Sequence, residues 1–454
     1  MPERETITLI GAGLVGSLLA IILAKRGFKV EILERRPDMR KQLISAGRSI
    51  NLAISERGLN ALRQIDLEED VLSQAISMKG RMIHSLDGGL SLQPYSPDQK
   101  HSINSISRAT LNKLLMDKAE ATGQVTITFN KRLFDIDLDS KLLEVINERN
   151  GRLEVFSYNK VIGTDGSASA VRHKLSQLNG AVNDESMLEH GYKELLIPAG
   201  QDGAFQLEKN ALHIWPRGTF MLIALPNFEA TYTCTLFLPF KGPASFEQLE
   251  KPEAVTKFFE EQFADAVPLL HDLTGTFLTN PTGHMVTVKC APWSYEDQVL
   301  LMGDAAHGIV PFYGQGMNCG FEDCTIFAEC LDNMLNSGHN SPGDWQQLFS
   351  NFWQMRKPHT DAIADMAVEN FLEMRDKVAD PKFQLHKQVE QLLEKTFPGK
   401  FNSRYSLVTF SNEPYMKAMQ QGKDNEALLE TLCKDIKVSE DVDLNYAASL
   451  LHVS

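Results

Sequence analysis

The sequence predicts an α/β protein in which a mainly antiparallel sheet domain is inserted into a domain with a parallel sheet, and a helical C-terminal region follows. Three observations predict this architecture. The chain opens on a strand, a glycine turn, a helix and a second strand, a βαβ unit of the kind that builds parallel sheets. Short strands with alternating apolar residues fill residues 181–284. After a buried strand returns at VLLMGDAAH (299–307), the pattern from about residue 356 is mostly helical.

The first element is the βαβ unit, whose turn GAGLVG carries Gly11, Gly13 and Gly16 between a strand and a helix that ends at Gly27. The first glycine permits the tight turn, the second lets backbone approach a pyrophosphate, and the third lets helix and strand pack closely. The helix N-terminus adds free N–H groups and a partial positive charge. The pattern predicts a Rossmann-like dinucleotide site, although such glycines can also serve packing alone.

A carboxylate at the end of the second strand favours the dinucleotide. Glu34 lies eighteen residues after Gly16, where it can accept hydrogen bonds from both hydroxyls of an adenosine ribose. Arg35 follows it and either contacts the adenosine side or is solvated.

The apolar run of residues 7–24 is long enough to imitate a signal sequence or a membrane anchor. Glu3 and Glu5 precede it, however, and KVEILE (29–34) resumes at once as a strand. We therefore expect a buried strand and helix there, and no membrane span.

The composition favours a small-molecule ligand in a reducing compartment. A formal net charge of -14, with no basic cluster, argues against nucleic acid. Six cysteines in 454 residues make no disulfide framework, so we expect a cytoplasmic protein. We also expect a monomer or a weak dimer. Cys319, Cys324 and Cys330 lack CxxC spacing, so we expect buried helix cysteines and no metal site.

The later elements divide the chain further. Residues 107–123 read as a helix ended by Gly123, and NKVIGTDG (159–166) ends another strand in a glycine turn. The predicted division is a discontinuous first domain at 1–180 and 285–355, a sheet domain at 181–284, and a helical region at 356–454.

A second acid and a second glycine loop decide between NAD and FAD. Asp304 follows a buried strand, and PFYGQG then leads into a helix that begins near Gly316, Met317 and Asn318. A nicotinamide dehydrogenase needs only the first βαβ unit. An extended FAD needs a second site, where an aspartate binds polar oxygens and helix N–H groups stabilise negative charge on the reduced flavin ring.

These motifs resemble those of the single-component FAD-dependent aromatic hydroxylases: GAGLVG with Glu34, IGTDG (162–166) and GDAAH (303–307). Further segments, KGRMIHS (79–85), PFYGQGMN (311–318) and RYSLVTF (404–410), extend the resemblance into the C-terminal region and imply members that act on L-kynurenine. Gly308 and Tyr313 depart from residues common in the family.

The resemblance implies the site residues. The expected cofactor contacts are Gly11, Gly13, Gly16, Glu34, Arg35, Ala53, Arg108, Leu133, Asp304, Gly316, Met317 and Asn318. Arg81 and Tyr95 would bind the substrate carboxylate, with Asn370 and Tyr405 completing the polar end. The apolar pocket would comprise Ile223, Leu225, Phe237, Phe312 and Met374. Taken alone, Arg81 and Tyr95 read as surface residues, Asn370 as a satisfied core amide, and the strand residues as core.

The implied activity is hydroxylation of L-kynurenine to 3-hydroxykynurenine with NADPH and O2, through a flavin hydroperoxide. No second GxGxxG follows a strand, so NADPH is expected to bind transiently. The electron-rich aminophenyl ring needs no protein base, so His307 is expected to be structural. The alternatives are a hydroxylase of another aromatic acid, a non-catalytic FAD-fold binding protein, and a nicotinamide dehydrogenase.

Overall fold

The computed structural model describes residues 5–41, 51–96, 100–376 and 380–452. The chain forms two compact units, each built from three segments. Unit 1 comprises Met1–Ala75, Ile106–Leu188 and Met285–Ala364. Unit 2 comprises Ile76–Ser105, Glu189–His284 and Asp365–Ser454.

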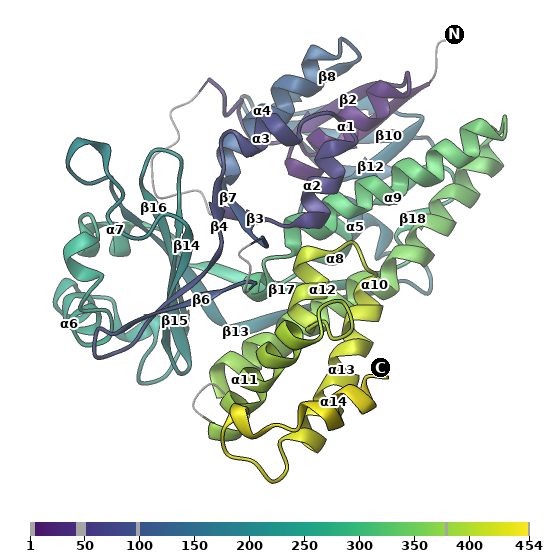
Figure 1. Cartoon of the computed structure of the whole chain (residues 1–454). Helices are drawn as coiled ribbons and strands as arrows, with labels where there is room; N and C mark the ends of the chain where they lie inside the picture. The colour runs from purple at the N-terminus through teal and green to yellow at the C-terminus, as the bar shows by residue number, and fades with distance from the viewer. Residues whose placement is uncertain (1–4, 42–50, 97–99, 377–379, 453–454) are drawn as a thin grey trace. The chain divides into compact units, whose positions relative to one another are not determined.

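Unit 1 is built on a six-stranded sheet of order β18-β19-β12-β1-β2-β8. Its strands are β1 (Thr6–Ile10), β2 (Lys29–Glu34), β8 (Val125–Phe129), β12 (Lys160–Gly163), β18 (Ser294–Tyr295) and β19 (Val299–Leu301). Every pairing is parallel except that of the edge strand β18. Figure 1 labels β2, β8, β12 and β18 of this sheet. The predicted βαβ start and the returning strand at 299 are thereby confirmed.

Several helices accompany this sheet in unit 1. They are α1 (Leu14–Lys25), α2 (Glu56–Arg63), α3 (Glu68–Leu72), α4 (Arg108–Ala121), α5 (Ala170–Leu175), α8 (Asp304–His307) and α9 (Gly316–Asn336). Helix α1 is buried along nearly its whole length and packs beside α4 and α9. Its burial explains the apolar run of residues 7–24. Within the described chain, no helix has the length and apolar character that a membrane crossing requires.

Smaller sheets complete unit 1. An antiparallel sheet consists of β9 (Lys131–Asp137), β10 (Leu142–Asn147) and β11 (Arg152–Ser157). Three short strands form a separate sheet: β3 (Asn51–Ile54), β4 (Ile76–Met78) and β7 (Ile103–Ser107).

Unit 2 contains most of a seven-stranded sheet of order β17-β13-β16-β15-β14-β5-β6. The strands are β5 (Gly80–His84), β6 (Leu90–Pro94), β13 (Val182–Ile197), β14 (Ala211–Arg217), β15 (Phe220–Pro226), β16 (Tyr232–Pro239) and β17 (Gly283–Ala291). One face packs on α6 (Pro252–Gln262) and α7 (Leu273–Thr279) through a core that includes Trp215, Leu222 and Phe259. The C-terminal helices are α11 (Pro381–Thr396), α12 (Arg404–Phe410), α13 (Tyr415–Leu432) and α14 (Leu444–Leu450).

The two units differ from the predicted division. The predicted division assigns residues 76–105 to the first domain, but they belong to unit 2, because β5 pairs in parallel with β14 and β6 pairs with β5. Helix α10 (Pro342–Asp376) runs through residue 356 without a break, Pro358 included, and the units divide within it at 364. The separation of 181–284 and 356–454 into independent domains stays a prediction.

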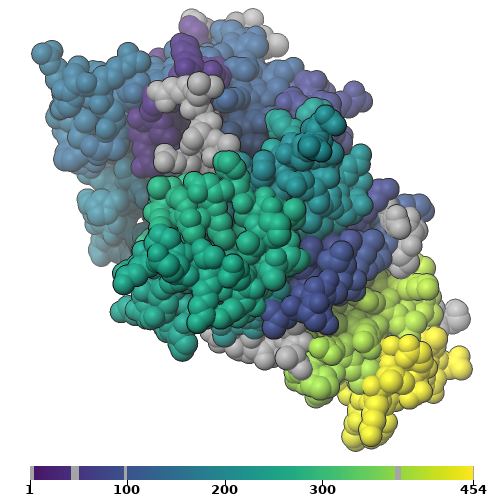
Figure 2. All heavy atoms as spheres, turned by 90° about the vertical axis from the view of Figure 1, so that its left-hand side faces the viewer, coloured from purple at the N-terminus to yellow at the C-terminus, as the bar shows by residue number. Residues whose placement is uncertain are grey.

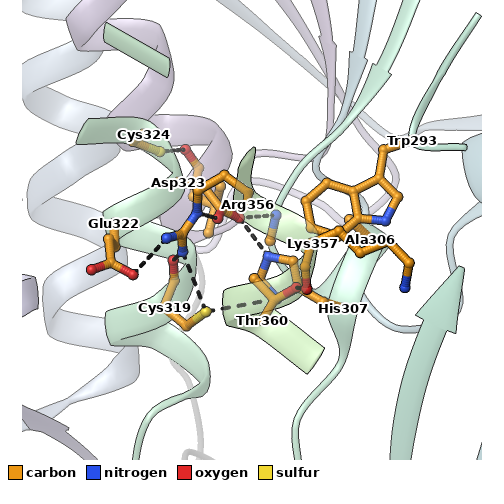
Figure 3. Close-up of polar contacts among 12 residues, drawn as sticks. Trp293, Ala306, His307, Cys319, Glu322, Asp323, Cys324, Arg356, Lys357 and Thr360 are labelled. Atoms are coloured by element: carbon orange, nitrogen blue, oxygen red, sulfur yellow. Dashed lines mark hydrogen bonds and ion pairs between the residues drawn. The ribbon is translucent and has the colours of Figure 1, made fainter. Parts of the chain in front are cut away.

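A buried charge network joins α9 and α10 to the loop before α8 (Figure 3). Asp323 accepts hydrogen bonds from the Gly303 backbone N–H at 2.9 Å, from His307 Nε2 and from Arg356 Nε at 2.8 Å. Arg356 also pairs with Glu322 at 2.8 Å, and Glu322 pairs with Arg57. Burial alone would raise the pKa of Asp323, but the positive charges of His307 and Arg356 outweigh burial and lower the pKa below its ordinary value. The carboxylate therefore stays ionised.

We predict that Arg356→Met destabilises the protein by about 3 to 5 kcal/mol, because it removes the guanidinium that pairs with the buried Asp323 carboxylate. The matched control is Arg63→Met, which removes an arginine paired with Glu56 and Glu68 near the surface. The control is expected to cost less than about 1 kcal/mol. Urea denaturation of both variants checks this, and equal losses would contradict a structural role for the network.

Candidate functional site

The first predicted cradle is the N-terminus of α1. Gly13 caps the helix without a side-chain hydrogen bond, and the first intrahelical bond runs from Ser17 N to Gly13 O at 2.9 Å. The backbone N–H groups of Leu14, Val15 and Gly16 therefore precede the helix hydrogen bonds and carry its positive dipole end. This geometry suits a pyrophosphate.

The glycines of the turn divide into packing and open positions. A Cβ on Gly16 would lie 2.1 Å from the Gly11 carbonyl oxygen and 2.6 Å from Thr164 Oγ1, so only glycine fits there. Gly11 has φ +104°, a conformation that side chains disfavour. A Cβ on Gly13 would meet nothing within 4 Å. The space above Gly13 is thus open to a bound group.

Glu34 lies against the same turn. One carboxylate oxygen accepts from Ala12 N at 2.8 Å and the other from Arg36 N at 2.8 Å, so backbone fixes the side chain while further lone pairs stay available. Sequence reasoning missed Asn112, whose amide donates to the Ala12 carbonyl at 3.1 Å. Its Oδ1 is buried and has no hydrogen-bond partner among the described residues.

The second predicted cradle is the N-terminus of α9. The first intrahelical bond there runs from Cys319 N to Gln315 O, so the N–H groups of Gly316, Met317 and Asn318 precede it. The Asn318 side chain is committed within the protein: Oδ1 accepts from Ser55 N at 3.0 Å, and Nδ2 donates to Ala53 O and Gly314 O, each at 2.9 Å. Asn318 therefore offers a ligand its backbone N–H group and holds the Ala53 strand in place.

The two cradles meet at one side chain, Val15 of α1. A Cβ on Gly303 would lie 3.0 Å from Val15 Cγ2, and a Cβ on Gly320 would lie 2.7 Å from the same atom. These two glycines let the loop before Asp304 and the first turns of α9 approach the first turn of α1 closely. Asp304 is half-buried, and no hydrogen bond or ion pair joins its carboxylate to any described residue.

The remaining predicted cofactor contacts also lie in unit 1, but their positions do not by themselves indicate a cofactor site. Arg35 is exposed, and so is Arg108 at the start of α4. The Leu133 side chain packs in the core of unit 1, and its position in β9 is paired with Val145 of β10. Asp165 of the IGTDG motif caps α5, accepting from Ala170 N at 2.7 Å, so it serves the fold directly.

These residues fit FAD. Two neighbouring sets of free N–H groups, the open space at Gly13 and the buried unpartnered oxygens of Asn112 and Ser55 suit a long anionic cofactor with polar groups along its length. All the predicted cofactor contacts fall in unit 1.

The predicted carboxylate-binding residues of the substrate meet in unit 2. The Arg81 guanidinium lies 4.4 Å from the ring centroid of Tyr405 and 5.7 Å from that of Tyr95, and the two tyrosine rings stack at 5.9 Å. Figure 2 shows the β5–β6 hairpin, in dark blue, against the yellow-green C-terminal helices. Burial lowers the pKa of Arg81, but Tyr405 and Tyr95 raise it more, so the guanidinium stays charged.

The predicted apolar residues share a sheet face with Arg81. Ile214 of β14 pairs with Ile223 on one side and with Ile83, two residues from Arg81, on the other. Phe237 pairs with Met221, two residues from Ile223. Because paired residues project to the same side, four predicted residues lie on one face, opposite the α6–α7 core. These are Arg81, Ile223, Leu225 and Phe237.

The three other predicted substrate residues lie outside this sheet. Asn370 is half-buried on α10 beside Glu369, which pairs with Arg404 of α12 at 2.9 Å, next to Tyr405. Phe312 belongs to unit 1, in the turn before α9. Met374 lies in α10, but its side chain is outside the described part of the chain.

His307 is structural in its contacts. Its side chain is 1% exposed, and its Nε2 is hydrogen-bonded to Asp323 (Figure 3). Its Nδ1 lies 4.0 Å from the Cys319 sulfur. The ligand atoms of these three residues lie within 4.8 Å of one another. Arg356 donates to both Asp323 and Cys319, and its fixed positive charge disfavours a metal ion there.

We predict that Gly13→Ala folds like the native chain but binds FAD at least about tenfold more weakly, because the new methyl group occupies open space needed by the cofactor. Gly16→Ala is the matched comparison. It should lower the free energy of unfolding by about 1 to 3 kcal/mol even without FAD, because its methyl group meets backbone. Equilibrium dialysis with FAD and thermal denaturation separate the two effects. Native FAD affinity in Gly13→Ala would argue against the cradle.

Comparison with known proteins agrees with this site. An FAD binding domain family matches residues 4–344. The kynurenine 3-monooxygenase of Myxococcus xanthus is 54% identical over 449 residues, covering 99% of this chain and 95% of the relative. That of Dictyostelium discoideum is 44% identical over 455 residues, covering 99% and 98%.

Solved structures show the same fold at low identity. A tetrameric form of 2-methyl-3-hydroxypyridine-5-carboxylic acid oxygenase aligns with a TM-score of 0.66 at 20% identity, covering 87% of this chain and 96% of that one. The p-nitrophenol 4-monooxygenase PnpA from Pseudomonas putida aligns with a TM-score of 0.65 at 16% identity, covering 96% and 99%. The chain therefore belongs to the FAD-binding family of flavoprotein monooxygenases, among the kynurenine 3-monooxygenases.

Proposed function

We propose that this protein is an FAD-dependent monooxygenase that hydroxylates the ring of L-kynurenine to 3-hydroxykynurenine, consuming NADPH and O2. The similarity to kynurenine 3-monooxygenases over nearly the full length carries the proposal, because it includes both units and the C-terminal helices. A generic cofactor domain would account only for unit 1.

The residues of unit 2 suit an amino acid with an aromatic ring. Arg81 offers a forked donor to a carboxylate, and the Tyr95 and Tyr405 phenols beside it can add hydrogen bonds. Burial, with Tyr405, keeps the pKa of Tyr95 well above its usual range despite Arg81, so this phenol remains a donor. Ile223, Leu225 and Phe237 of the same face give an aryl ring apolar contacts.

The chemistry divides between cofactor and protein. Bound FAD, reduced by NADPH, supplies the activation of O2. The free N–H groups at the start of α9 stabilise negative charge, and the sheet face of unit 2 positions the ring. The amino substituent already makes the ring electron-rich, so no protein base is assigned. His307 stays a structural residue in this account.

We also propose a cytoplasmic protein, monomeric or weakly dimeric, whose partners are the amino acid, NADPH and O2. Cysteine chemistry supports the reducing compartment: all six cysteines are free thiols, and five of them are buried.

We expect the purified protein to be yellow and to oxidise NADPH faster when L-kynurenine is added, with 3-hydroxykynurenine as the product. Absorbance spectra with NADPH, with and without kynurenine, and chromatography of the product check this. Kynurenine that fails to accelerate NADPH oxidation, while another aromatic acid does, would assign a different substrate.

We predict that Arg81→Met raises the KM for kynurenine about 10- to 100-fold at unchanged FAD content, since each charged hydrogen bond lost is worth about 1.5 to 3 kcal/mol. The matched control, Lys79→Met, removes an exposed charge two residues away and should leave KM unchanged. Steady-state kinetics of both variants test the carboxylate assignment, which a native KM in Arg81→Met would remove.

A further inference from the structure

Two histidines are buried in unit 2 on the sheet face opposite Arg81. His84 ends β5 and is 2% exposed, and His213 lies on β14 and is 1% exposed. His84 Nε2 lies 2.9 Å from His213 Nδ1, so a hydrogen bond joins the two rings directly. The other nitrogen of each ring is also bonded, at a short distance, to an oxygen that accepts.

The three hydrogen bonds of these two rings need three protons, whereas two neutral imidazole rings carry only two N–H protons. His213 Nε2 lies 2.8 Å from the Glu208 carbonyl oxygen, which can only accept, so this nitrogen carries a proton. The contact between the rings needs a second proton. His84 Nδ1 lies 2.7 Å from Asp265 Oδ2 and needs a third. Two neutral imidazoles supply two protons, so the third is additional.

The charge balance favours keeping this third proton. With it, the cluster of His84, His213 and Asp265 is neutral overall, whether the proton sits on a ring or on the carboxyl group. Without it, the cluster carries a negative charge on Asp265, whose side chain is 33% exposed, and the contact of His84 Nδ1 with Asp265 Oδ2 brings two lone pairs together. The repulsion between these lone pairs, at the buried His84 ring, disfavours the state without the third proton. The Trp215 indole N–H donates to the Asp265 carboxylate at 2.9 Å. The Trp215 ring stacks on the His84 ring, with 3.9 Å between the ring centroids.

The groups around the cluster restrict where the charge can lie. Burial lowers the pKa of His213 to about 4, so this ring is not the cation. Burial lowers the pKa of His84 as well; the adjacent Asp265 opposes this shift and Arg217 reinforces it. The direct contact with Asp265 is therefore what favours a proton at His84 Nδ1. Arg217 donates to the His84 carbonyl at 3.0 Å, and the Tyr232 ring faces His213 edge-on.

We propose that His84, His213 and Asp265 bind one proton in common, and that this shared proton fixes β5 against β14 and thereby positions Arg81. Met82 of β5 pairs with His213 in the sheet, and Arg81 is the preceding residue on the opposite face. His84 and His213 are therefore positioning residues. The proposal for Arg81 rests on the proposed function, whereas the shared proton does not.

Asp265→Asn distinguishes the shared proton from an ordinary hydrogen bond. The asparagine amide can donate to His84 Nδ1 and its oxygen can accept from Trp215, so two neutral rings then satisfy every contact. Unfolded histidines lose their protons near pH 6.5. Above that pH the native chain holds a proton that the unfolded chain lacks, so its stability falls as pH rises, by up to tenfold in the unfolding equilibrium constant per pH unit.

The test compares Tm of the native protein, Asp265→Asn and the exposed control His271→Gln between pH 7 and pH 9, all loaded with FAD. We expect the Tm advantage of the native protein over Asp265→Asn to shrink as pH rises, while His271→Gln follows the native protein. An advantage that does not change with pH would overturn the shared proton.

The positioning role has its own readout. Asp265→Ala removes the acceptor and should raise the KM for kynurenine several-fold with little change in kcat or FAD content, and Asp265→Asn should restore KM toward the native value. A lower Tm in Asp265→Ala at native KM would overturn the positioning role. If kynurenine is not a substrate, kinetics fail for every variant, but the pH dependence of Tm still tests the proton.

Discussion

Two helix N-termini, those of α1 and α9, approach each other at the Val15 side chain, and the cofactor site depends on that contact. It exists because Gly303 and Gly320 have no Cβ to keep the segments apart. Asp323 maintains it by holding the Gly303 N–H at 2.9 Å, while Arg356 and His307 balance its charge. The buried network thus places two sets of unbonded N–H groups where one anionic molecule can bind both.

Unit 2 applies a related principle to a sheet. Side chains alternate across β5, so Arg81 projects to the proposed substrate face and His84 to the opposite core. The hairpin of β5 and β6 ends the sheet, and main-chain hydrogen bonds tie it on one side to β14. The contacts of His84 with His213 and Asp265 add side-chain bonds at this joint. On the other face, Tyr405 from α12 covers Arg81. Residues distant in sequence therefore define the position of one guanidinium.

What the sequence predicted followed from local chemistry. A turn with Gly11, Gly13 and Gly16 permits few conformations, and Glu34 at the following strand end must lie near it, as the bond to Ala12 N confirms. Nonlocal pairing was not predictable in this way. Nothing in residues 76–105 indicates that β5 joins β14, and Arg81 reads as a surface residue because Tyr405 covers it from the far end of the chain. The pairing of His84 with His213 is hidden for the same reason.

The central claim is that one extended FAD molecule binds along unit 1, from the α1 N-terminus to the α9 N-terminus. An experimentally determined structure of the FAD complex tests it most directly. The account predicts pyrophosphate oxygens within hydrogen-bond distance of the N–H groups that follow Gly13, and flavin ring oxygens within reach of the N–H groups of Met317 and Asn318. Cofactor density that contacts only one of the two helix ends would contradict it.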